Sequence, residues 1–215
     1  MYTEMNQPEE IKRELLSGEL KDVSIQRADL RALPLADAVV CRVKFEAVAF
    51  QTVEARNISL ERVGIIGASA REARFTSMRA NHLEIQGSDF IEANFAGSRM
   101  TDSAFRDTGM MNARFTGSTI VDTIFDGADL SGADFSGAIL IRSAFMDPNL
   151  GHANLTGCNF SNSVLIDCDF RGSNLYQANF EGAILAQVDL RDANLVNSSI
   201  SSATQINAFL DRADL

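Results

Sequence analysis

Residues of the types that commonly carry out chemistry are few in this chain: two histidines and three cysteines, namely His82, His152, Cys41, Cys158 and Cys168. A histidine can act as a general base or a metal ligand, and a cysteine as a nucleophile or a zinc ligand. The cysteines form an odd set without CxxC spacing, which argues against a disulfide framework and against zinc. Whether the histidines can share a site depends on the fold that positions them.

A period of five runs through the sequence from Leu20 to Leu215. Every fifth position in this range is apolar with the single exception of Gln205, and all phenylalanines but Phe209 lie at these positions. The residue two positions before each of them is never charged. All charged side chains of residues 21–215 therefore occupy the other three positions of the five.

This period matches neither the roughly 3.6 residues of a helical turn nor the two-residue alternation of a strand, so the chain must turn at every repeat. Segments such as DGADL (Asp126–Leu130), SGADF (Ser131–Phe135) and RGSNL (Arg171–Leu175) resemble the A(D/N)LXX repeats of the pentapeptide-repeat family. This resemblance implies an all-β fold, a right-handed quadrilateral parallel β-helix with one pentapeptide per side and four per coil. It also implies that each fifth residue, called the centre below, and the residue two before it point inward.

We therefore predict two parts: an N-terminal segment with a capping helix over residues 1–19, and a pentapeptide-repeat β-solenoid over residues 20–215. Its pentapeptides would form about ten coils, in a rod about 47 Å long at about 4.8 Å per coil. Pro8 suits the first turn of the helix, and Gly18 its end. The apolar face of the helix would consist of Ile11, Leu15 and Leu16.

Such a fold keeps the candidates for chemistry apart. His82 and His152 are separated by fourteen pentapeptides, or three and a half coils, so they would lie on opposite sides of the rod. Cys158 and Cys168 occupy inward positions, where they would fill the core. Acids on the outside of a filled rod have no concave pocket to shift their pKa values. We expect a non-enzymatic protein without cofactor or metal.

Departures from the repeat pattern predict local effects. Glycine is frequent two residues after the centre, which suits corners of positive φ; these are Gly117, Gly127, Gly132, Gly137, Gly157, Gly172 and Gly182. In the N-terminal half, bulky residues replace Ala or Ser at the inward position, namely Leu33, Val43, Val48, Val53, Ile58 and Val63. Small centres at Ala55, Ala70 and Ala80 would offset this volume, and less regular turns are expected there. Pro148 lacks an N–H donor and predicts a defect in the ladder.

Charge and hydropathy limit the partners. The net charge of -10 argues against direct nucleic-acid binding, which needs clustered Lys and Arg. The excess is uneven, because residues 21–114 hold 12 acids and 13 bases whereas residues 115–215 hold 12 acids and 4 bases. No apolar run reaches the roughly 18 residues of a membrane span, and residues 1–20 lack a signal-peptide core, so we expect a cytoplasmic protein without membrane contact.

The two ends of the rod differ. A solenoid exposes an apolar cross-section and unpaired backbone at each end, and the helix would cover the first coil. The repeat continues to the last residue without such a cover. Either two rods stack into a homodimer through the C-terminal coil, or the natural chain was longer. The candidate dimer end consists of Phe209, Leu210 and Leu215.

Residues one coil apart should stack into columns. Apolar residues follow two neighbouring columns, and the candidate apolar interface consists of Ile124, Met146, Val164, Ile166, Ile184 and Ile206. Either strand propensity or a protein interface could explain it. The candidate acidic face consists of Asp122, Asp126, Asp129, Asp134, Asp147, Asp167, Asp169, Asp189 and Asp214. The asparagines in the same columns, such as Asn154 and Asn174, can form purely structural ladders.

Two hypotheses of function follow. The resemblance to quinolone-resistance members implies an acidic rod that mimics B-form DNA and binds DNA gyrase or topoisomerase IV, and so protects or modulates it. Arg171 and Arg191 lie two residues after Asp169 and Asp189 and would partly neutralise such a face. The sequence also lacks an insertion loop and a C-terminal helix after the repeats, which some of these members have. The alternative is an adaptor or regulatory module that grips a protein partner through the apolar columns.

Overall fold

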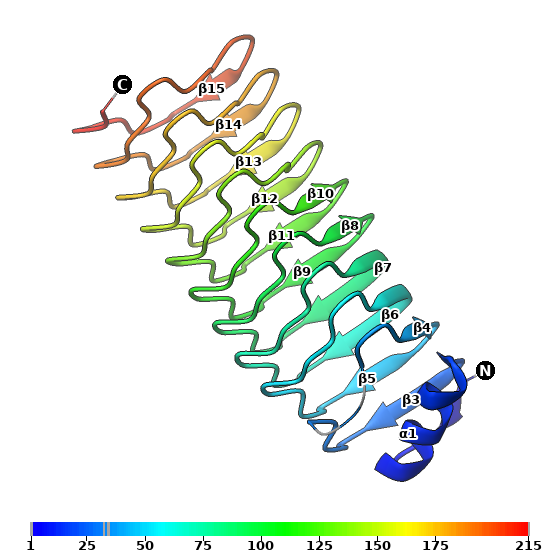
Figure 1. The fold of residues 1–215 in the computed structure, drawn as a ribbon. Coiled ribbons are helices and arrows are strands. Elements are labelled where there is room, and N and C mark those ends of the chain that lie inside the picture. Colours follow the sequence, from blue (N-terminus) through cyan, green and yellow to red (C-terminus); the bar gives the residue numbers. More distant parts are fainter. Residues whose placement is uncertain (1, 32, 34, 215) are drawn as a thin grey trace.

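The chain forms a four-sided rod of stacked coils with one helix at its N-terminal end (Figure 1). The computed structural model describes residues 2–31, 33 and 35–214. The strands pair in parallel within one sheet, which confirms the predicted right-handed quadrilateral β-solenoid of about ten coils. The elements are β1 (Thr3–Glu4), α1 (Pro8–Ser17), β2 (Glu19–Lys21), β3 (Val23–Gln26), β4 (Val39–Cys41), β5 (Lys44–Glu46), β6 (Ser59–Ile66), β7 (Arg79–Gln86), β8 (Arg99–Thr101), β9 (Ala104–Arg106), β10 (Thr119–Val121), β11 (Ile124–Asp126), β12 (Ala144–Met146), β13 (Val164–Ile166), β14 (Ile184–Ala186) and β15 (Thr204–Ile206).

Each coil consists of four pentapeptides, one on each side, so that a residue pairs with its counterpart four pentapeptides later, as Phe105 does with Phe125. The sides are numbered 1 to 4 from the centres Leu20, Ile25, Leu30 and Leu35. Side 2 is a continuous parallel sheet from β1 to β15.

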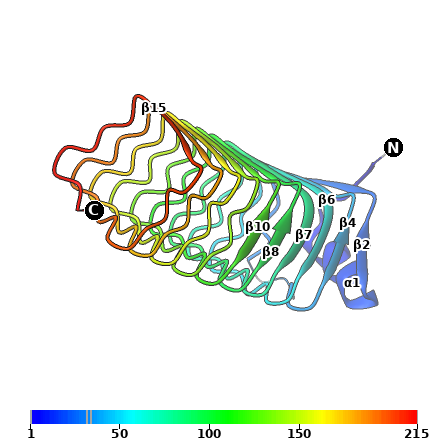
Figure 2. The same ribbon diagram turned by 90° about the horizontal axis from the view of Figure 1, so that it is seen from above.

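The other sides have less regular pairing. Side 1 forms strands as far as β10 and isolated bridges beyond it, such as Thr119 to Ile139. Sides 3 and 4 are joined by isolated bridges alone among the described residues, so side 2 is the side with strands along the whole described rod. Figure 2 shows the coils stacked along the axis from another direction.

The corners share one backbone conformation. The residue two after the centre has a φ between 49° and 66° at every described corner, whether it is glycine or not. Asp, Asn and Gly are frequent there because this left-handed region is strained for other side chains. The predicted role of the corner glycines is thereby confirmed.

Some corner glycines have a second role, because the side chain one coil earlier leans over them. His152 Nδ1 lies 2.7 Å from the position that a Cβ on Gly172 would take, and Asn112 Oδ1 lies 2.5 Å from that of Gly132. Gly137 has no such neighbour within 4 Å. Gly132 and Gly172 therefore leave space for the Asn112 and His152 side chains of the preceding coil.

The core consists of columns of centre residues. On side 2, Phe105, Phe125 and Phe145 stack with ring centroids 5.0 and 4.8 Å apart, and all three are fully buried. Phe115 and Phe135 on side 4 stack at 4.5 Å. These buried rings fill the interior of the rod in these coils, as the inward position of the centres requires.

Buried hydroxyl groups at the inward positions were not anticipated from the sequence. Ser98 Oγ donates to the carbonyl of Phe75 at 2.8 Å and accepts from the N–H of Met78 at 3.1 Å. Ser103 Oγ similarly accepts from the N–H of Leu83 at 3.1 Å. These two serines thus hydrogen-bond to buried backbone groups of the preceding coil, as is usual for buried polar groups, whereas the buried hydroxyls of Ser118 and Ser173 have no partner among the described residues.

The N-terminal end is covered as predicted, with one correction. Helix α1 begins at Pro8, and Gly18 ends it with a φ of 117° while donating to the carbonyl of Leu15 at 3.1 Å. Ile11 and Leu15 are buried, but Leu16 is 68% exposed and does not belong to the apolar face.

One strand precedes the helix and was not predicted. Strand β1 pairs with β3, and Met5 directly after β1 is buried. The five-residue period of inward residues therefore extends into the segment before Leu20.

Two further expectations about irregularity are wrong. Pro148 causes no defect, because the N–H groups of its column make no backbone hydrogen bonds in the described coils, and the carbonyl of Pro148 still accepts from Asp169 at 3.2 Å. The described corners of the N-terminal half keep the same positive φ as the others. What differs there is that β6 and β7 each run through sides 1 and 2 as one eight-residue strand.

Candidate interaction surfaces

The residues considered for chemistry do not form a site. His82 lies at the corner between sides 1 and 2, whereas His152 lies at the opposite corner, between sides 3 and 4. Cys158 and Cys168 are buried, and burial raises the pKa of both thiols far above their usual range. Within the described part of the chain, no three His, Cys, Asp or Glu residues are grouped so as to hold a metal ion.

The candidate apolar interface is a contiguous surface. Register pairs stack Ile124, Ala144, Val164 and Ile184 into one column of side 2, and Met146, Ile166, Ala186 and Ile206 into the next. Together with Ala104, these residues form what we call the apolar stripe. Ile184 and Ile206 are 40% and 49% exposed, and the other residues named as candidates are half-buried. The stripe therefore offers apolar side chains to a partner along five successive strands, β11 to β15.

Three carboxylates border the apolar stripe on one edge. Asp126 lies in the same column as Met146, directly before it, and Asp147 and Asp167 follow at the corner between sides 2 and 3. None of the three has an ion pair with another described residue. We call these three carboxylates the acidic edge of the apolar stripe; Arg106 lies one coil before Asp126 in the same column but forms no ion pair with it.

The nine aspartates of the candidate acidic face do not share one side. Asp129, Asp169 and Asp189 lie on side 3, Asp134 and Asp214 on side 4, Asp126 on side 2, Asp122 at the corner of sides 1 and 2, and Asp147 and Asp167 at the corner of sides 2 and 3. The structure brings together two sets, the side 3 column and the acidic edge of the apolar stripe.

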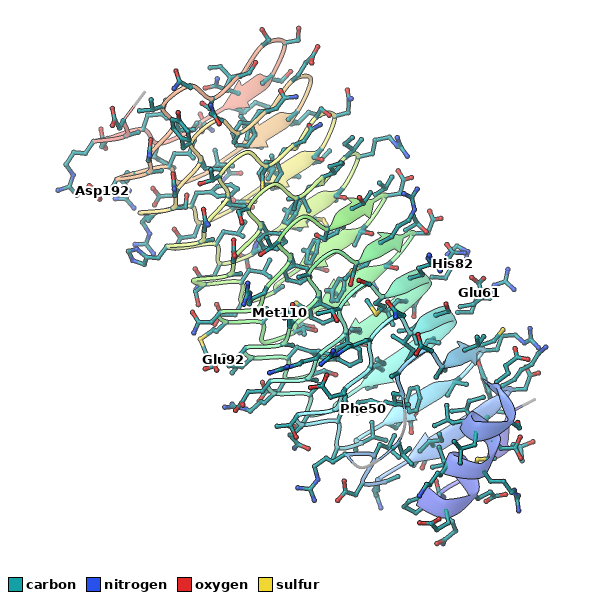
Figure 3. All side chains as sticks on the ribbon, in the orientation of Figure 1. Phe50, Glu61, His82, Glu92, Met110 and Asp192 are labelled. Carbon is teal, nitrogen blue, oxygen red and sulfur yellow. The ribbon has the colours of Figure 1, made fainter. Side chains whose placement is uncertain are left out.

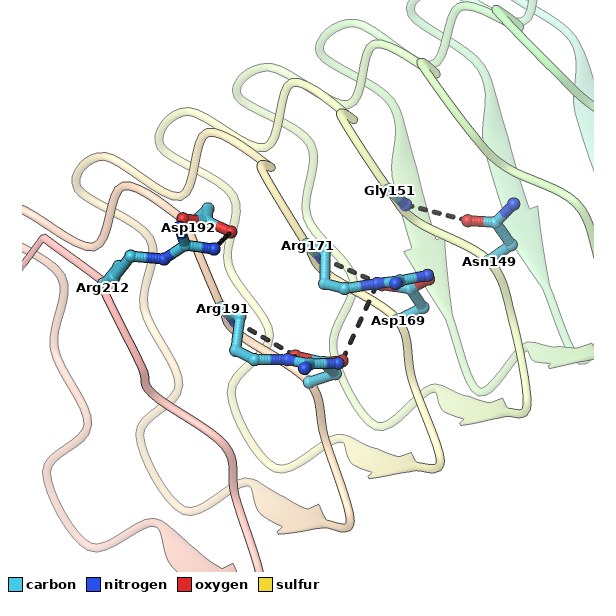
Figure 4. Close-up of polar contacts among 8 residues, drawn as sticks. Asn149, Gly151, Asp169, Arg171, Arg191, Asp192 and Arg212 are labelled. Carbon is cyan, nitrogen blue, oxygen red and sulfur yellow. Dashed lines mark hydrogen bonds and ion pairs between the residues drawn. The ribbon is translucent and has the colours of Figure 1, made fainter.

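The side 3 column is largely neutralised by arginines. Arg171 binds Asp169 through Nη2 at 2.6 Å and reaches Asp189 in the next coil at 3.7 Å, while Arg191 binds Asp189 at 2.5 Å. Figure 4 shows the two guanidinium groups lying in parallel over this column. Their hydrogen bonds lower the pKa of Asp169 and of Asp189.

A similar pair lies at the corner of sides 1 and 2. Arg142 Nη2 binds Asp122 Oδ2 of the preceding coil at 2.6 Å. This hydrogen bond lowers the pKa of Asp122. The sequence count of acids therefore overstates the free negative charge of the C-terminal half.

The asparagines of these columns form structural ladders. Asn149 Nδ2 donates to Asp129 Oδ1 of the preceding coil at 3.1 Å, and Asn149 Oδ1 accepts from the N–H of Gly151 at 3.0 Å. On side 4, Asn194 donates to Asn174 at 3.1 Å. These side chains are occupied within the rod, so they hold coils together.

The C-terminal coil is open. Phe209 and Leu210 are 53% and 40% exposed, while Leu215 lies outside the described residues. An apolar hollow of about 280 Å³ enters the end of the rod between Leu190, Leu195 and Leu210. In Figure 1 this end has no counterpart of α1 among the described residues.

Comparison with known proteins places these features in a family. Residues 118–195 match the family model described as pentapeptide repeat region. This stretch therefore belongs to a pentapeptide-repeat region, and the described rod as a whole has the fold of a pentapeptide-repeat β-solenoid. None of the curated proteins matches it in sequence.

Two solved pentapeptide-repeat structures resemble the rod over most of its length. HetL, described as involved in heterocyst differentiation regulation in the cyanobacterium Nostoc sp. strain PCC 7120, is 21% identical, with a TM-score of 0.63 and coverage of 97% of this chain and 96% of HetL. QnrB1, a plasmid-mediated fluoroquinolone resistance protein, is 17% identical, with a TM-score of 0.60 and coverage of 88% and 93%. At these identities the likeness establishes the fold alone.

Pentapeptide-repeat solenoids generally serve as structural or interaction modules. The only helix of the described residues, α1, has ten residues, and it is too short and too polar to cross a membrane.

One feature of the surface escaped the sequence analysis. Arg79 and Arg99 stack on side 1 as register partners of β7 and β8. Their spacing of one coil, or four pentapeptides, is the signal that would have found them.

Proposed function

We propose that this pentapeptide-repeat solenoid is a non-enzymatic module that binds a protein partner through the apolar stripe of side 2. The observation that carries the proposal is a parallel sheet, β11 to β15, with two neighbouring outward columns that are largely apolar and include the exposed Ile184 and Ile206. Contiguous exposed apolar surface on a soluble protein usually marks an interaction site. A cytoplasmic location belongs to the same proposal, and the three free cysteines suit it.

The chemistry of the edge specifies the kind of partner. The unpaired Asp126, Asp147 and Asp167 would complement basic groups beside an apolar face. From Ala104 in β9 to Ile206 in β15 the stripe spans five coil steps, or about 24 Å at about 4.8 Å per coil. This length matches an amphipathic helix of about 16 residues at about 1.5 Å per residue, with Lys or Arg along one edge.

A synthetic peptide provides a direct test. We expect a labelled amphipathic helix of this length, with leucines on one face and lysines along one edge, to bind, as measured by fluorescence anisotropy. Ile184→Asp should abolish binding, whereas Ile139→Asp should leave it unchanged, because Ile139 is similarly exposed but lies on side 1. The same peptide with glutamates in place of the lysines should bind more weakly. Equal loss in both variants would contradict a site on side 2.

A second candidate function is binding to DNA gyrase or topoisomerase IV by DNA mimicry. It is favoured by the excess of acids over residues 115–215 and agrees with what is said of QnrB1. Arginines neutralise Asp169 and Asp189, so this face is less acidic than the number of acids in the sequence suggests. In this case the purified protein should inhibit gyrase supercoiling or protect gyrase from a quinolone, and Asp129→Lys with Asp169→Lys should remove the effect. If the protein neither inhibits supercoiling nor protects gyrase, this function is excluded.

The proposal also includes a homodimer through the C-terminal coil. Two such ends have the same outline, and a two-fold contact would fit the exposed Phe209 and Leu210 of each copy against the open end of the other. Sedimentation equilibrium should show a dimer that Leu210→Asp converts to a monomer. A monomer at high protein concentration would contradict this contact.

A further inference from the structure

Two arginines stack directly on one another on side 1. Arg79 of β7 and Arg99 of β8 are register partners in a parallel pair, and both are exposed. Adjacent parallel strands lie about 4.8 Å apart. Like charges in such directly opposed positions destabilise a sheet unless something neutralises them.

Most of the ion-paired arginines elsewhere along the rod find their acid by one of two simple rules. The partner lies one coil earlier in the same column, as Asp22 does for Arg42 at 2.6 Å, or two residues earlier, as Asp169 does for Arg171.

Neither rule supplies a partner for the stacked arginines. For Arg79, these positions hold Ser59 and Ser77, and for Arg99 they hold Arg79 itself and Gly97. Accordingly, neither arginine has an ion pair within 4.0 Å among the residues that the structure describes.

The two arginines border a hollow of about 270 Å³ on side 1. Val39, which is 40% exposed, and Ser59 precede the two arginines in the same column, and Asn81 and Thr101 line the hollow from the neighbouring column. Strands β6, β7 and β8, which carry it, lie side by side in Figure 1, and Figure 3 labels Glu61 at this place.

The one acid in this hollow is already engaged. Glu61 Oε2 accepts from Asn81 Nδ2 at 3.0 Å, and Glu61 Oε1 lies 3.7 Å from Arg62 Nε. Asn81 Oδ1 in turn accepts from Thr101 Oγ1 at 3.0 Å. This row of hydrogen bonds engages Glu61, Asn81 and Thr101, and it leaves the guanidinium groups of Arg79 and Arg99 as the unpaired cationic donors of the hollow among the described residues.

We propose that Arg79 and Arg99 together bind the phosphate group of a small phosphate monoester. A guanidinium presents a planar fork of N–H donors, and one fork already saturates the two oxygens of a carboxylate. Two adjacent forks fit a tetrahedral group with three free oxygens and a charge near -2 at neutral pH. The organic substituent of the monoester would extend along the same column over Ser59 toward Val39. This site is on side 1, so it does not depend on the apolar stripe.

Isothermal titration calorimetry on the full chain at pH 7.5 tests the site with three probes: phenyl phosphate, inorganic phosphate and benzoate. We expect phenyl phosphate to bind and benzoate to bind at least about tenfold more weakly, since removal of charge-assisted hydrogen bonds costs that much. Tighter binding of phenyl phosphate than of inorganic phosphate assigns the ligand to an organic monoester. Equal affinities would overturn the monoester and assign the two arginines to free phosphate.

Arginine variants locate the binding. Arg79→Gln and Arg99→Gln should each weaken phenyl phosphate binding about tenfold or more, and the double variant should abolish it. Arg114→Gln, at an exposed arginine of side 4, is the matched control and should bind normally. Circular dichroism verifies folding, which the substitutions should not impair because they relieve repulsion. No binding by the unaltered chain, or unchanged binding by the double variant, would overturn the proposal.

Discussion

The two halves of the rod fill the same tube in different ways. In the C-terminal half, small inward residues such as Ala128 and Ala133 accompany large centres such as Phe125 and Phe135, and rings stack from coil to coil. In the N-terminal half, bulky residues such as Val53 occupy the inward position next to small centres such as Ala55. The same interior is thus filled with its volume distributed differently, as dense packing requires.

The second difference between the halves is how much of the perimeter forms strands. From β2 to β10 both sides 1 and 2 are strands, and β6 and β7 continue through the corner between them. Beyond residue 121, side 2 is the only strand-forming side in the described coils. Bulky, β-branched inward residues accompany the wider sheet, which matches their preference for extended backbone.

The largest effect should come from the aromatic columns, which distinguish the C-terminal half. Phe125→Ala removes a fully buried ring stacked between two others and should cost about 3–5 kcal/mol of unfolding free energy. Phe50→Ala should fall at the lower end of this range, because a void of about 20 Å³ already lies beside Phe50 and its neighbours can relax. Urea unfolding of both variants measures the difference, and equal costs would refute it.

The stability cost of replacing a corner glycine by alanine in the C-terminal half should depend on whether a side chain of the preceding coil lies against it. Gly172→Ala must displace the ring of His152 in addition to adopting a φ of 64°, for a total of about 2 kcal/mol. Gly137→Ala, with a φ of 65° and no neighbour within 4 Å, should cost only about 1 kcal/mol. The difference in cost between Gly172→Ala and Gly137→Ala should disappear when His152 is also replaced by Ala. Thermal unfolding of the variants measures these costs.

The pairing of arginines with aspartates in the C-terminal half should make a small, pH-dependent contribution to the free energy of unfolding. The pKa values of Asp169 and Asp189 are lowered in the folded state, so their contribution is present above the unfolded pKa of about 3.9 and is lost as pH falls through the lowered values. Arg171→Gln with Arg191→Gln should destabilise by less than about 1 kcal/mol at pH 7. Urea midpoints of the variant and the unaltered chain should converge toward pH 2, and a difference that grows in acid would be the opposite result.

Proline at an inward position should have almost no effect. Pro148→Ala restores an N–H in a column that makes no backbone hydrogen bonds in the described coils, so stability should change by only about 0.5 kcal/mol. Asn149→Pro, one residue later, removes the hydrogen bond from Asn149 N to Ala128 O and should be severely destabilising, as urea unfolding would show. A substantial loss in Pro148→Ala would show that the ring itself packs tightly.

The fold could be predicted from the sequence because inward and outward residues alternate with a fixed period. The columns followed from the same period, which placed Ile124 against Ala144 and Asp169 against Asp189.

Other features depend on details that a period does not contain. The absence of a defect at Pro148 could not be predicted, because it depends on which N–H groups the turns leave unused. The engagement of Glu61 by Asn81 depends on side-chain conformation. Strand β1 was missed because Met5 alone represents the five-residue period before α1.

The stacking of coils that touch only their neighbours also determines how the molecule would respond to mechanical load. A force applied along the axis would act on each interface in series, so coils would peel away one at a time from the open C-terminal end, where α1 offers no protection. Each released coil of four pentapeptides would lengthen the chain by about 60–70 Å, at about 3.3–3.6 Å per residue. Stretching in an optical trap should therefore produce a sawtooth of small, evenly spaced steps.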